Sequence, residues 1–270
     1  NAKNWRLVKF EYDNPEPENW IDVIPESHNP LSSVSIVDGK LLVKYSKDVS
    51  SKLYVYNMAG KMETEVSLPT MGTAYGFDGK MEDTEVFYTF TSFAYPTTVF
   101  RYDIRKNTSI LYRKSKIDID FSKYETKQIF YSSKDGTRIP MFITHKKGLI
   151  YDGTAPTLLY AYGGFNISIN PHFSISRMLI MESDGIYATA NIRGGGEYGE
   201  SWHEDGMLTN KQNVFDDFIA AADYLVKENY TSREKLSIQG GSNGGLLIGT
   251  VINQRPDLCA VALPEVGVMD

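Results

Sequence analysis

The stretch Lys235-Leu-Ser-Ile-Gln-Gly-Gly-Ser-Asn-Gly-Gly-Leu-Leu-Ile-Gly-Thr250 decides the fold of the second half of this 270-residue chain. Its alternating apolar start predicts a short strand, its glycines predict a sharp turn at Ser242, and its apolar end predicts a helix. Strand, G-x-S-x-G and helix together form the pattern of a nucleophile elbow, in which a side chain at Gly240 or Gly244 would clash with the neighbouring strand or helix. The alternative interpretation is an ordinary glycine-rich turn between a strand and a helix.

The elbow pattern identifies candidate catalytic groups. It would expose the hydroxyl of Ser242, the candidate nucleophile, and place the Asn243 N–H at a helix N-terminus, where it can hold an oxyanion. An earlier buried strand ends in Tyr162-Gly-Gly-Phe165, at the place where hydrolases with such an elbow supply a second oxyanion donor. The Tyr162 hydroxyl is a competent donor. The alternative for this segment is a strand that leaves its sheet through a Gly-Gly turn.

The residues around the elbow alternate between predicted strands and helices, which is typical of a parallel sheet with helices on its faces. The helix signal is strongest at 214–229, where we expect Asn213 as the N-cap, Asp216 as the acid of a capping box, and Asp217 on the surface. The predicted strands lie at 157–162, 186–192, 236–239 and 259–263, and a hairpin with an Asp-Gly turn precedes them at 124–131 and 138–144.

The first 116 residues have a different, repetitive texture. Three strand-like tetrads, Leu7–Phe10, Leu53–Tyr56 and Val99–Tyr102, begin 46 residues apart, and each is followed by turn residues and a further strand-like run. Several short strands per period of this length are typical of β-propeller blades, and the alternative is a chance recurrence in a β-sandwich. Since about two and a half blades would leave sheet edges open, we expect further blades upstream.

The composition limits the classes of partner. A net charge of −6 with a pI near 5.4 argues against nucleic acid and anionic membranes, and no apolar run approaches the ~18 residues of a membrane helix. A single cysteine, Cys259, cannot form an internal disulfide, which suits the reducing cytoplasm. We therefore expect a cytoplasmic location, and we separately expect a monomer.

Two further sets of residues are candidates for functional sites. Residues 194–199 match G-x-G-x-x-G, but no helix opens at once and no acid closes a following strand, so we expect a structural loop with unusual φ values and no cofactor. No histidine follows Ser242; His203 is the best internal candidate for a base but precedes the serine, and Asp257 is expected to be a surface charge. The chain thus carries a nucleophile without a complete catalytic triad, and we expect no metal site.

Taken together, the motifs resemble the prolyl oligopeptidase family along essentially the whole chain. The resemblance is carried by Gly240–Gly245, with asparagine after the serine, and by four other segments: Tyr162–Asn166, Asn191–Gly199, Asn210–Asn213 and Asn253–Asp257. It implies an α/β-hydrolase domain at 117–270, of which only the N-terminal half is present, preceded by the C-terminal blades of a β-propeller at 1–116.

The resemblance also implies an activity, which is hydrolysis of short proline-containing peptides on the carboxyl side of proline. Ser242 would be acylated, the Asn243 N–H and the Tyr162 hydroxyl would form the oxyanion hole, and Phe165 would line the pocket for proline. The family's catalytic Asp and His would lie beyond Asp270, so we expect residues 1–270 alone to have little or no peptidase activity. Two other functions remain open, a non-catalytic scaffold protein and an esterase on the same fold.

Overall fold

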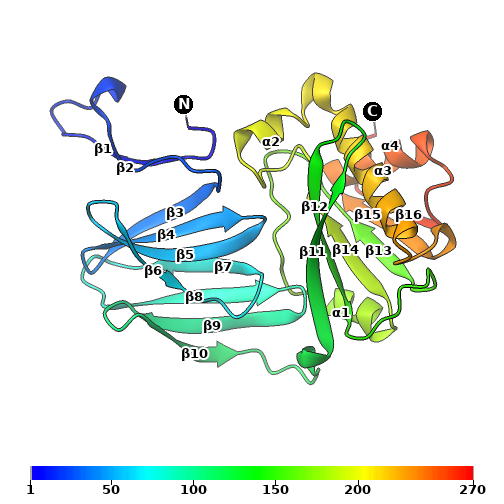
Figure 1. Ribbon diagram of the computed structural model, residues 1–270, viewed down its shortest axis with the longest axis horizontal. Coiled ribbons are helices and arrows are strands. Elements are labelled where there is room, and N and C mark those ends of the chain that lie inside the picture. Colours follow the sequence, from blue (N-terminus) through cyan, green and yellow to red (C-terminus); the bar gives the residue numbers. More distant parts are fainter. Residues whose placement is uncertain (1, 270) are drawn as a thin grey trace. The chain divides into compact units, whose positions relative to one another are not determined.

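A computed structural model of the chain describes residues 2–269, which separate into two compact units (Figure 1). The first unit contains residues 2–117 and 170–172, and the second contains residues 118–169 and 173–269. None of the helices in residues 2–269 is both long enough and apolar enough to cross a membrane.

The first unit consists of antiparallel sheets formed by strands that follow one another in the chain. A two-stranded sheet pairs β1 (Leu7–Lys9) with β2 (Ile21–Ile24). The next sheet has the order β3-β4-β5-β6, from strands Leu31–Val37, Lys40–Lys47, Ser50–Asn57 and Met62–Val66. The last has the order β10-β9-β8-β7, from strands Thr73–Asp78 (β7), Glu85–Ser92 (β8), Tyr95–Asp103 (β9) and Thr108–Lys114 (β10).

Two of the three copies of the 46-residue repeat fall on equivalent strands of the two four-stranded sheets, whereas the first copy, Leu7–Phe10, overlaps β1 of the two-stranded sheet. Leu53–Tyr56 lies in β5 and Val99–Tyr102 lies in β9, and each is the third strand of its sheet in chain order. Residues of both sheets share one apolar core, to which Leu53 and Tyr102 both belong. The repeat therefore reports a recurring four-stranded meander. The first strands, β3 and β7, had no clear signal, because serines interrupt the apolar residues of β3 and Gly76 interrupts those of β7.

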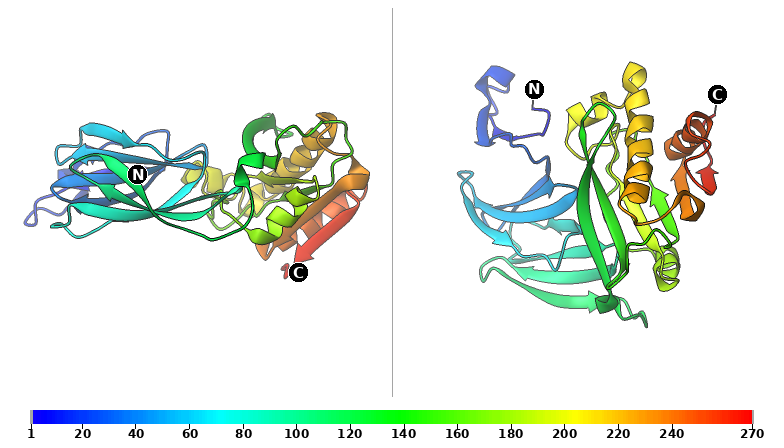
Figure 2. Two further views of the ribbon diagram at one scale, coloured as in Figure 1. Left: turned by 90° about the horizontal axis from the view of Figure 1, so that it is seen from below. Right: turned by 45° about the vertical axis from the view of Figure 1, so that its right-hand side comes forward.

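The second unit is built on a six-stranded mixed sheet with the order β11-β12-β14-β13-β15-β16 (Figure 2). The pairs β11–β12 and β12–β14 are antiparallel, and the other three pairs are parallel. The strands are Tyr124–Ser132 (β11), Arg138–Lys146 (β12), Thr157–Tyr160 (β13), Ile186–Ala190 (β14), Leu236–Gly241 (β15) and Val261–Glu265 (β16). The helices are Ile175–Glu182 (α1), Glu200–Glu204 (α2), Gln212–Lys227 (α3) and Asn243–Gln254 (α4).

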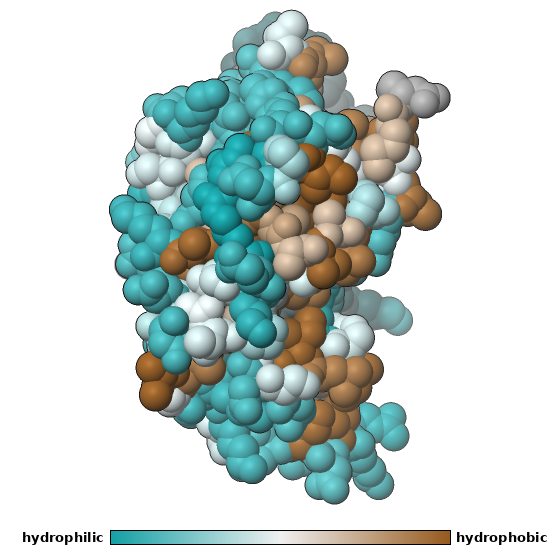
Figure 3. Space-filling view, turned by 90° about the vertical axis from the view of Figure 1, so that its right-hand side faces the viewer, coloured by the Kyte–Doolittle hydropathy of each residue, from teal (hydrophilic) through white to brown (hydrophobic). Residues whose placement is uncertain are grey.

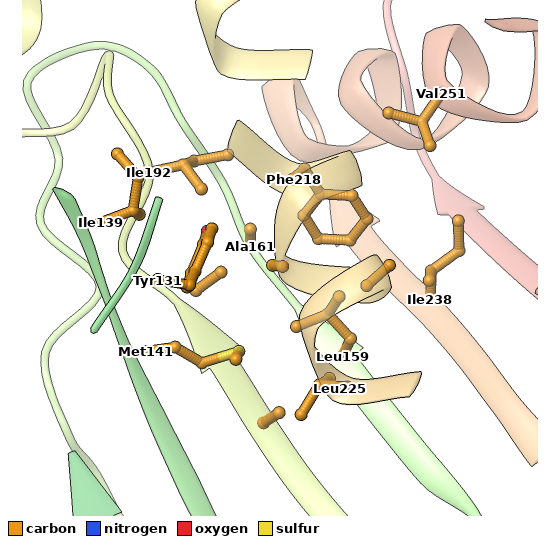
Figure 4. Close-up of a cluster of buried hydrophobic side chains, with 14 of the residues drawn as sticks. Tyr131, Ile139, Met141, Leu159, Ala161, Ile192, Phe218, Leu225, Ile238 and Val251 are labelled. Atoms are coloured by element: carbon orange, nitrogen blue, oxygen red, sulfur yellow. The ribbon is translucent and has the colours of Figure 1, made fainter. Parts of the chain in front are cut away.

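Strand β14 shows how the sheet separates its two faces. Ile186, Ala188 and Ala190 point into a core shared with α3 and α4, to which Phe218 and Val251 belong (Figure 4). Tyr187 points to the other face, where Arg177 of α1 stacks over its ring. All of β14 is buried. Helices on both faces explain why this strand reads as a continuous apolar run in the sequence.

The start of α3 corrects the sequence analysis. Lys211, not Asn213, precedes the helix, and no side chain caps it. The helix begins earlier than expected, after a 3-10 turn at Leu208–Asn210, so that Asn213 stands inside the first turn and donates to Asp205 O. Asp216 accepts from Gln212 Nε2 instead of closing a capping box.

The sheet ends at β16 with apolar side chains exposed. Val261 and Leu263 in the strand are 46% and 42% exposed, and Val266 after it is 85% exposed. Figure 3 shows brown, hydrophobic surface on this side of the molecule. Among the described residues, β16 is hydrogen-bonded to a neighbouring strand on one side only.

Candidate active site

The elbow has the predicted elements, with Ser242 between the end of β15 and the start of α4. Its backbone has φ 54° and ψ −115°, a conformation that residues other than glycine rarely adopt, and its side chain is exposed. Backbone hydrogen bonds on both sides of Ser242 maintain this conformation. The Ser242 N–H donates to Glu265 O of β16 (2.9 Å), and the Ser242 carbonyl accepts from Gly245 N (2.8 Å).

The glycines of the elbow are required by close backbone contacts. A Cβ on Gly240 would lie 2.4 Å from Gly244 O, and one on Gly244 would lie 2.9 Å from Ala161 O at the end of β13. These distances confirm the steric prediction, because Cβ atoms essentially never approach other atoms within 3.0 Å. Gly241 differs, since its nearest neighbour would be the Glu265 carboxylate at 3.7 Å, an ordinary contact.

Tyr162 and Asn243 lie beside each other at the elbow. Asn243 is 8% exposed, and its Nδ2 donates to the Tyr162 carbonyl at 2.6 Å. The Tyr162 ring comes within 3.7 Å of the position that a Cβ on Gly244 would take. Because the first N–H groups of a helix have no partner within the helix, the N-terminus of α4 can receive a negative charge here.

Phe165 lies further along the loop that Tyr162 begins. Its side chain is 72% exposed and its φ is 54°. The structure thus brings Ser242, Asn243 and Tyr162 together, whereas a role for Phe165 in a substrate pocket stays a prediction.

The two internal candidates for triad partners contact other parts of the chain. His203 Nδ1 lies 2.8 Å from Gly194 O and 3.1 Å from Asn166 N, and depending on the tautomer it donates to the first or accepts from the second. Asp257 pairs with Arg255 at 2.9 Å and with Arg233. These contacts join neither side chain to Ser242.

The glycine motif after β14 forms a loop that is packed from the inside. Gly194 and Gly199 have φ values of 90° and 82°, as expected for a structural loop. Glu197 is 2% exposed, and its Oε1 accepts from Ile169 N (3.0 Å) and Asn191 Nδ2 (3.2 Å). Burial raises the pKa of this carboxyl to about 7.

A buried ion pair supports the same loop. Arg193 donates from Nη2 to Asp217 Oδ1 (2.6 Å) and from Nε to Asp217 Oδ2 (3.0 Å), and it reaches Asp135 in the β11–β12 turn. Asp217 is fully buried, so its expected place on the surface was wrong. The helical pattern led to the wrong prediction because Asp217 borders the apolar stripe of α3. Its burial is explained by its ion pair with Arg193, which lies 24 residues earlier in the chain.

Lys211 also contacts the elbow, and the sequence analysis does not identify it as a candidate site residue. Lys211 Nζ donates to Gly163 O at 2.8 Å and to Asn243 Oδ1 at 3.0 Å, and burial lowers the pKa of this lysine. Its only signal in the sequence is negative, since a lysine directly before a helix opposes the helix dipole. Within residues 2–269, no group of three or more His, Cys, Asp or Glu side chains is placed to hold a metal ion.

Comparisons with known proteins agree with both units. Residues 1–115 match the family model described as "Prolyl oligopeptidase, N-terminal beta-propeller domain", and residues 171–270 match that of the "Prolyl oligopeptidase family". The whole chain is 48% identical to a prolyl endopeptidase of Elizabethkingia miricola, of which it covers 38%. It is also 46% identical, over 98% of its length, to a prolyl endopeptidase of Dictyostelium discoideum, of which it covers 36%.

Solved structures give the same answer. The chain superposes over its full length with a TM-score of 0.96 on a structure from a study of two prolyl endopeptidases, at 43% identity and covering 40% of that chain. It superposes with a TM-score of 0.94 on prolyl oligopeptidase B of Galerina marginata bound to a macrocyclization substrate, at 37% identity and covering 38% of that chain. The chain therefore spans well under half the length of these relatives, and it belongs to the prolyl oligopeptidase family.

Proposed function

We propose that the full-length protein carrying this chain is a serine endopeptidase that cleaves short peptides on the carboxyl side of proline. One observation carries the proposal. Ser242 is exposed in a strained conformation between β15 and α4, beside Asn243 and Tyr162. A strained, exposed serine at a helix N-terminus is the arrangement that acyl transfer requires. Relatives named prolyl endopeptidases support the choice of substrate.

Each residue at the elbow has a part in the reaction. The Ser242 Oγ attacks the carbonyl carbon of the prolyl residue, and the negative charge that develops on the carbonyl oxygen is held by the Asn243 N–H and the Tyr162 hydroxyl. Loss of the amine leaves an ester on Ser242, which water then hydrolyses. Phe165 provides apolar surface for the proline ring.

The proton from Ser242 needs a base, and we propose that this base and its acid partner are supplied from outside residues 1–270. No histidine follows Ser242 in the sequence, and His203 Nδ1 contacts Gly194 and Asn166. Residues 1–270 alone would then show little peptidase activity, since a serine without its base is a poor nucleophile at neutral pH.

The second unit would be the N-terminal half of an α/β-hydrolase domain. The apolar edge at β16 supports this proposal, because an exposed apolar edge strand is normally covered or paired. Further strands added beside β16 would bury Val261 and Leu263.

The test is turnover of the full-length protein on a Gly-Pro amide and on a simple ester, together with labelling by a fluorophosphonate. We expect Ser242-dependent labelling and cleavage of the amide after proline. Ser242→Ala should lower kcat by about 10⁴-fold or more, whereas Ser237→Ala, in the strand before the elbow, should keep the activity. Cleavage of the ester without the amide would favour an esterase. A folded protein without Ser242-dependent turnover would favour a scaffold.

A further inference from the structure

We propose that Lys211 is a positioning residue, which fixes the two donors of the oxyanion hole relative to each other through hydrogen bonds to Gly163 and Asn243. The inference rests on the function proposed above. Lys211 would act through Gly163 and Asn243, without contacting Ser242 or the substrate itself.

The contacts of Lys211 form a short chain of hydrogen bonds. Its Nζ donates to Gly163 O (2.8 Å) and to Asn243 Oδ1 (3.0 Å), and Asn243 Nδ2 in turn donates to Tyr162 O (2.6 Å). Tyr162 carries the hydroxyl donor, and Asn243 carries the backbone N–H donor. The lysine therefore joins the two segments that must present their donors to one oxygen atom.

The segment held by Lys211 has no room to shift toward its neighbours. A Cβ on Gly164 would lie 2.5 Å from Asn243 Nδ2, and one on Gly163 would lie 2.5 Å from Val214 Cγ1 in the first turn of α3. Gly163 also has φ 65°, which other residues rarely adopt. Residues 162–164 are thus packed between α3 and α4, and Lys211 supplies polar contacts that fix them there.

The place of Lys211 is unfavourable for a residue that serves stability alone. It directly precedes α3, where the partial positive charge of a helix N-terminus repels a cation, and burial lowers its pKa. Among residues 2–269, the partners of its Nζ are the Gly163 and Asn243 oxygens and not a carboxylate. Residues that break a local rule without an ionic partner tend to mark functional sites.

The experiment compares Lys211→Met, Lys211→Arg and a control, Lys227→Met, in the full-length protein, with kcat and KM for a Gly-Pro amide and the melting temperature as readouts. Lys227 lies at the opposite, C-terminal end of α3 and is exposed. We expect Lys211→Met to lower kcat about 10²-fold with KM changed less than about 3-fold, because misplaced donors weaken the transition state more than substrate binding. Lys211→Arg should recover at least about 10-fold of the loss, and Lys227→Met should change neither constant.

A double variant shows whether the contacts act as one unit. Asn243→Ala removes the side chain that Lys211 contacts and keeps the backbone N–H. If the two side chains act together, combining Asn243→Ala with Lys211→Met should lower kcat no more than about 3-fold below the worse single variant. Multiplication of the two losses would contradict the proposal.

Other outcomes are equally decisive. A folded Lys211→Met protein with kcat within about 2-fold of the unaltered enzyme would overturn the inference, as would a rise in KM with kcat unchanged. If Lys211→Met does not fold, Asn243→Ala decides instead, because a folded Asn243→Ala protein with kcat within about 2-fold of the unaltered enzyme would overturn the inference. Absence of Ser242-dependent turnover in the unaltered protein would refute the proposed function and this inference with it, whereas turnover that is insensitive to Lys211 would refute this inference alone.

Discussion

Two glycine-rich loops follow strands of the same sheet, and they differ in what they expose. The elbow loop (residues 240–245) follows β15 and presents the exposed, strained Ser242. The glycine loop (residues 193–199) follows β14 and buries its polar residues, with Arg193 3% and Glu197 2% exposed. In both loops a glycine replaced by a larger residue would strike neighbouring backbone, as at Gly240 and Gly194.

The comparison shows that a glycine motif reports crowding and not chemistry. In the elbow loop, the crowding turns the side chain of Ser242 outward at a helix N-terminus. In the glycine loop, it lets the backbone approach residues 163–167, where a Cβ on Gly194 would lie 2.6 Å from Gly163 O. The glycine loop therefore supports the segment that carries Tyr162.

The largest effect on stability is expected from the buried ion pair under the glycine loop. Asp217→Ala would leave Arg193 buried without its main partner, which typically destabilises a protein by about 3–5 kcal/mol. Urea denaturation of the full-length protein measures this change. The matched control is Asp216→Ala, the adjacent residue of α3, whose contact with Lys134 is 3.7 Å long and more exposed, so the expected loss is below about 1 kcal/mol. Equal losses in the two variants would show that the glycine loop does not depend on this pair.

The elbow loop should respond to added bulk at one glycine and not at the next. Gly240→Ala places a methyl group 2.4 Å from Gly244 O, and overpacking of this kind destabilises by about 3 kcal/mol. Gly241→Ala meets nothing closer than 3.7 Å and should change the free energy of unfolding by less than about 0.5 kcal/mol. Labelling of Ser242 by a fluorophosphonate should fail in the first variant and persist in the second. A tolerated Gly240→Ala would mean that the elbow is looser than its contacts imply.

The same two loops show how far the sequence could predict this molecule. Local signals were enough for the elbow, for the β11–β12 hairpin and for the recurring meander of the first unit, since periodicity and turn residues act over short distances. The predicted N-cap of α3 was wrong because a 3-10 turn before the helix moves its start to an earlier residue. The residues next to this turn carry no sequence signal for it.

The candidate site was predictable only where a residue belongs to a local motif or to the end of a predicted strand. Ser242 and Asn243 belong to one motif, and Tyr162 follows from its place after a strand. Lys211 and Asp217 were missed because their partners lie 24 to 48 residues away in the chain. Long-range polar contacts of this kind leave no periodic trace, and a charged residue in a helix then resembles a solvent-exposed one.

The smallest effect concerns the pH response of the glycine loop. Burial raises the pKa of Glu197 from its usual value of 4.5 to about 7, so the folded protein binds this proton more tightly than the unfolded chain does. The resulting stabilisation is fully present below about pH 4.5 and is lost as the pH rises through about 7. Between about pH 5 and about pH 8, the loss should be about 2 kcal/mol.

Glu197→Gln keeps the shape of the side chain without a titrating proton, so its free energy of unfolding should not decline over this pH range. Urea denaturation of the variant and the unaltered protein across this pH range measures the difference, with Glu228→Gln on the exposed end of α3 as the control. Parallel pH curves for Glu197→Gln and the unaltered protein would mean that Glu197 titrates normally, and the glycine loop would then be as accessible to water as the elbow loop.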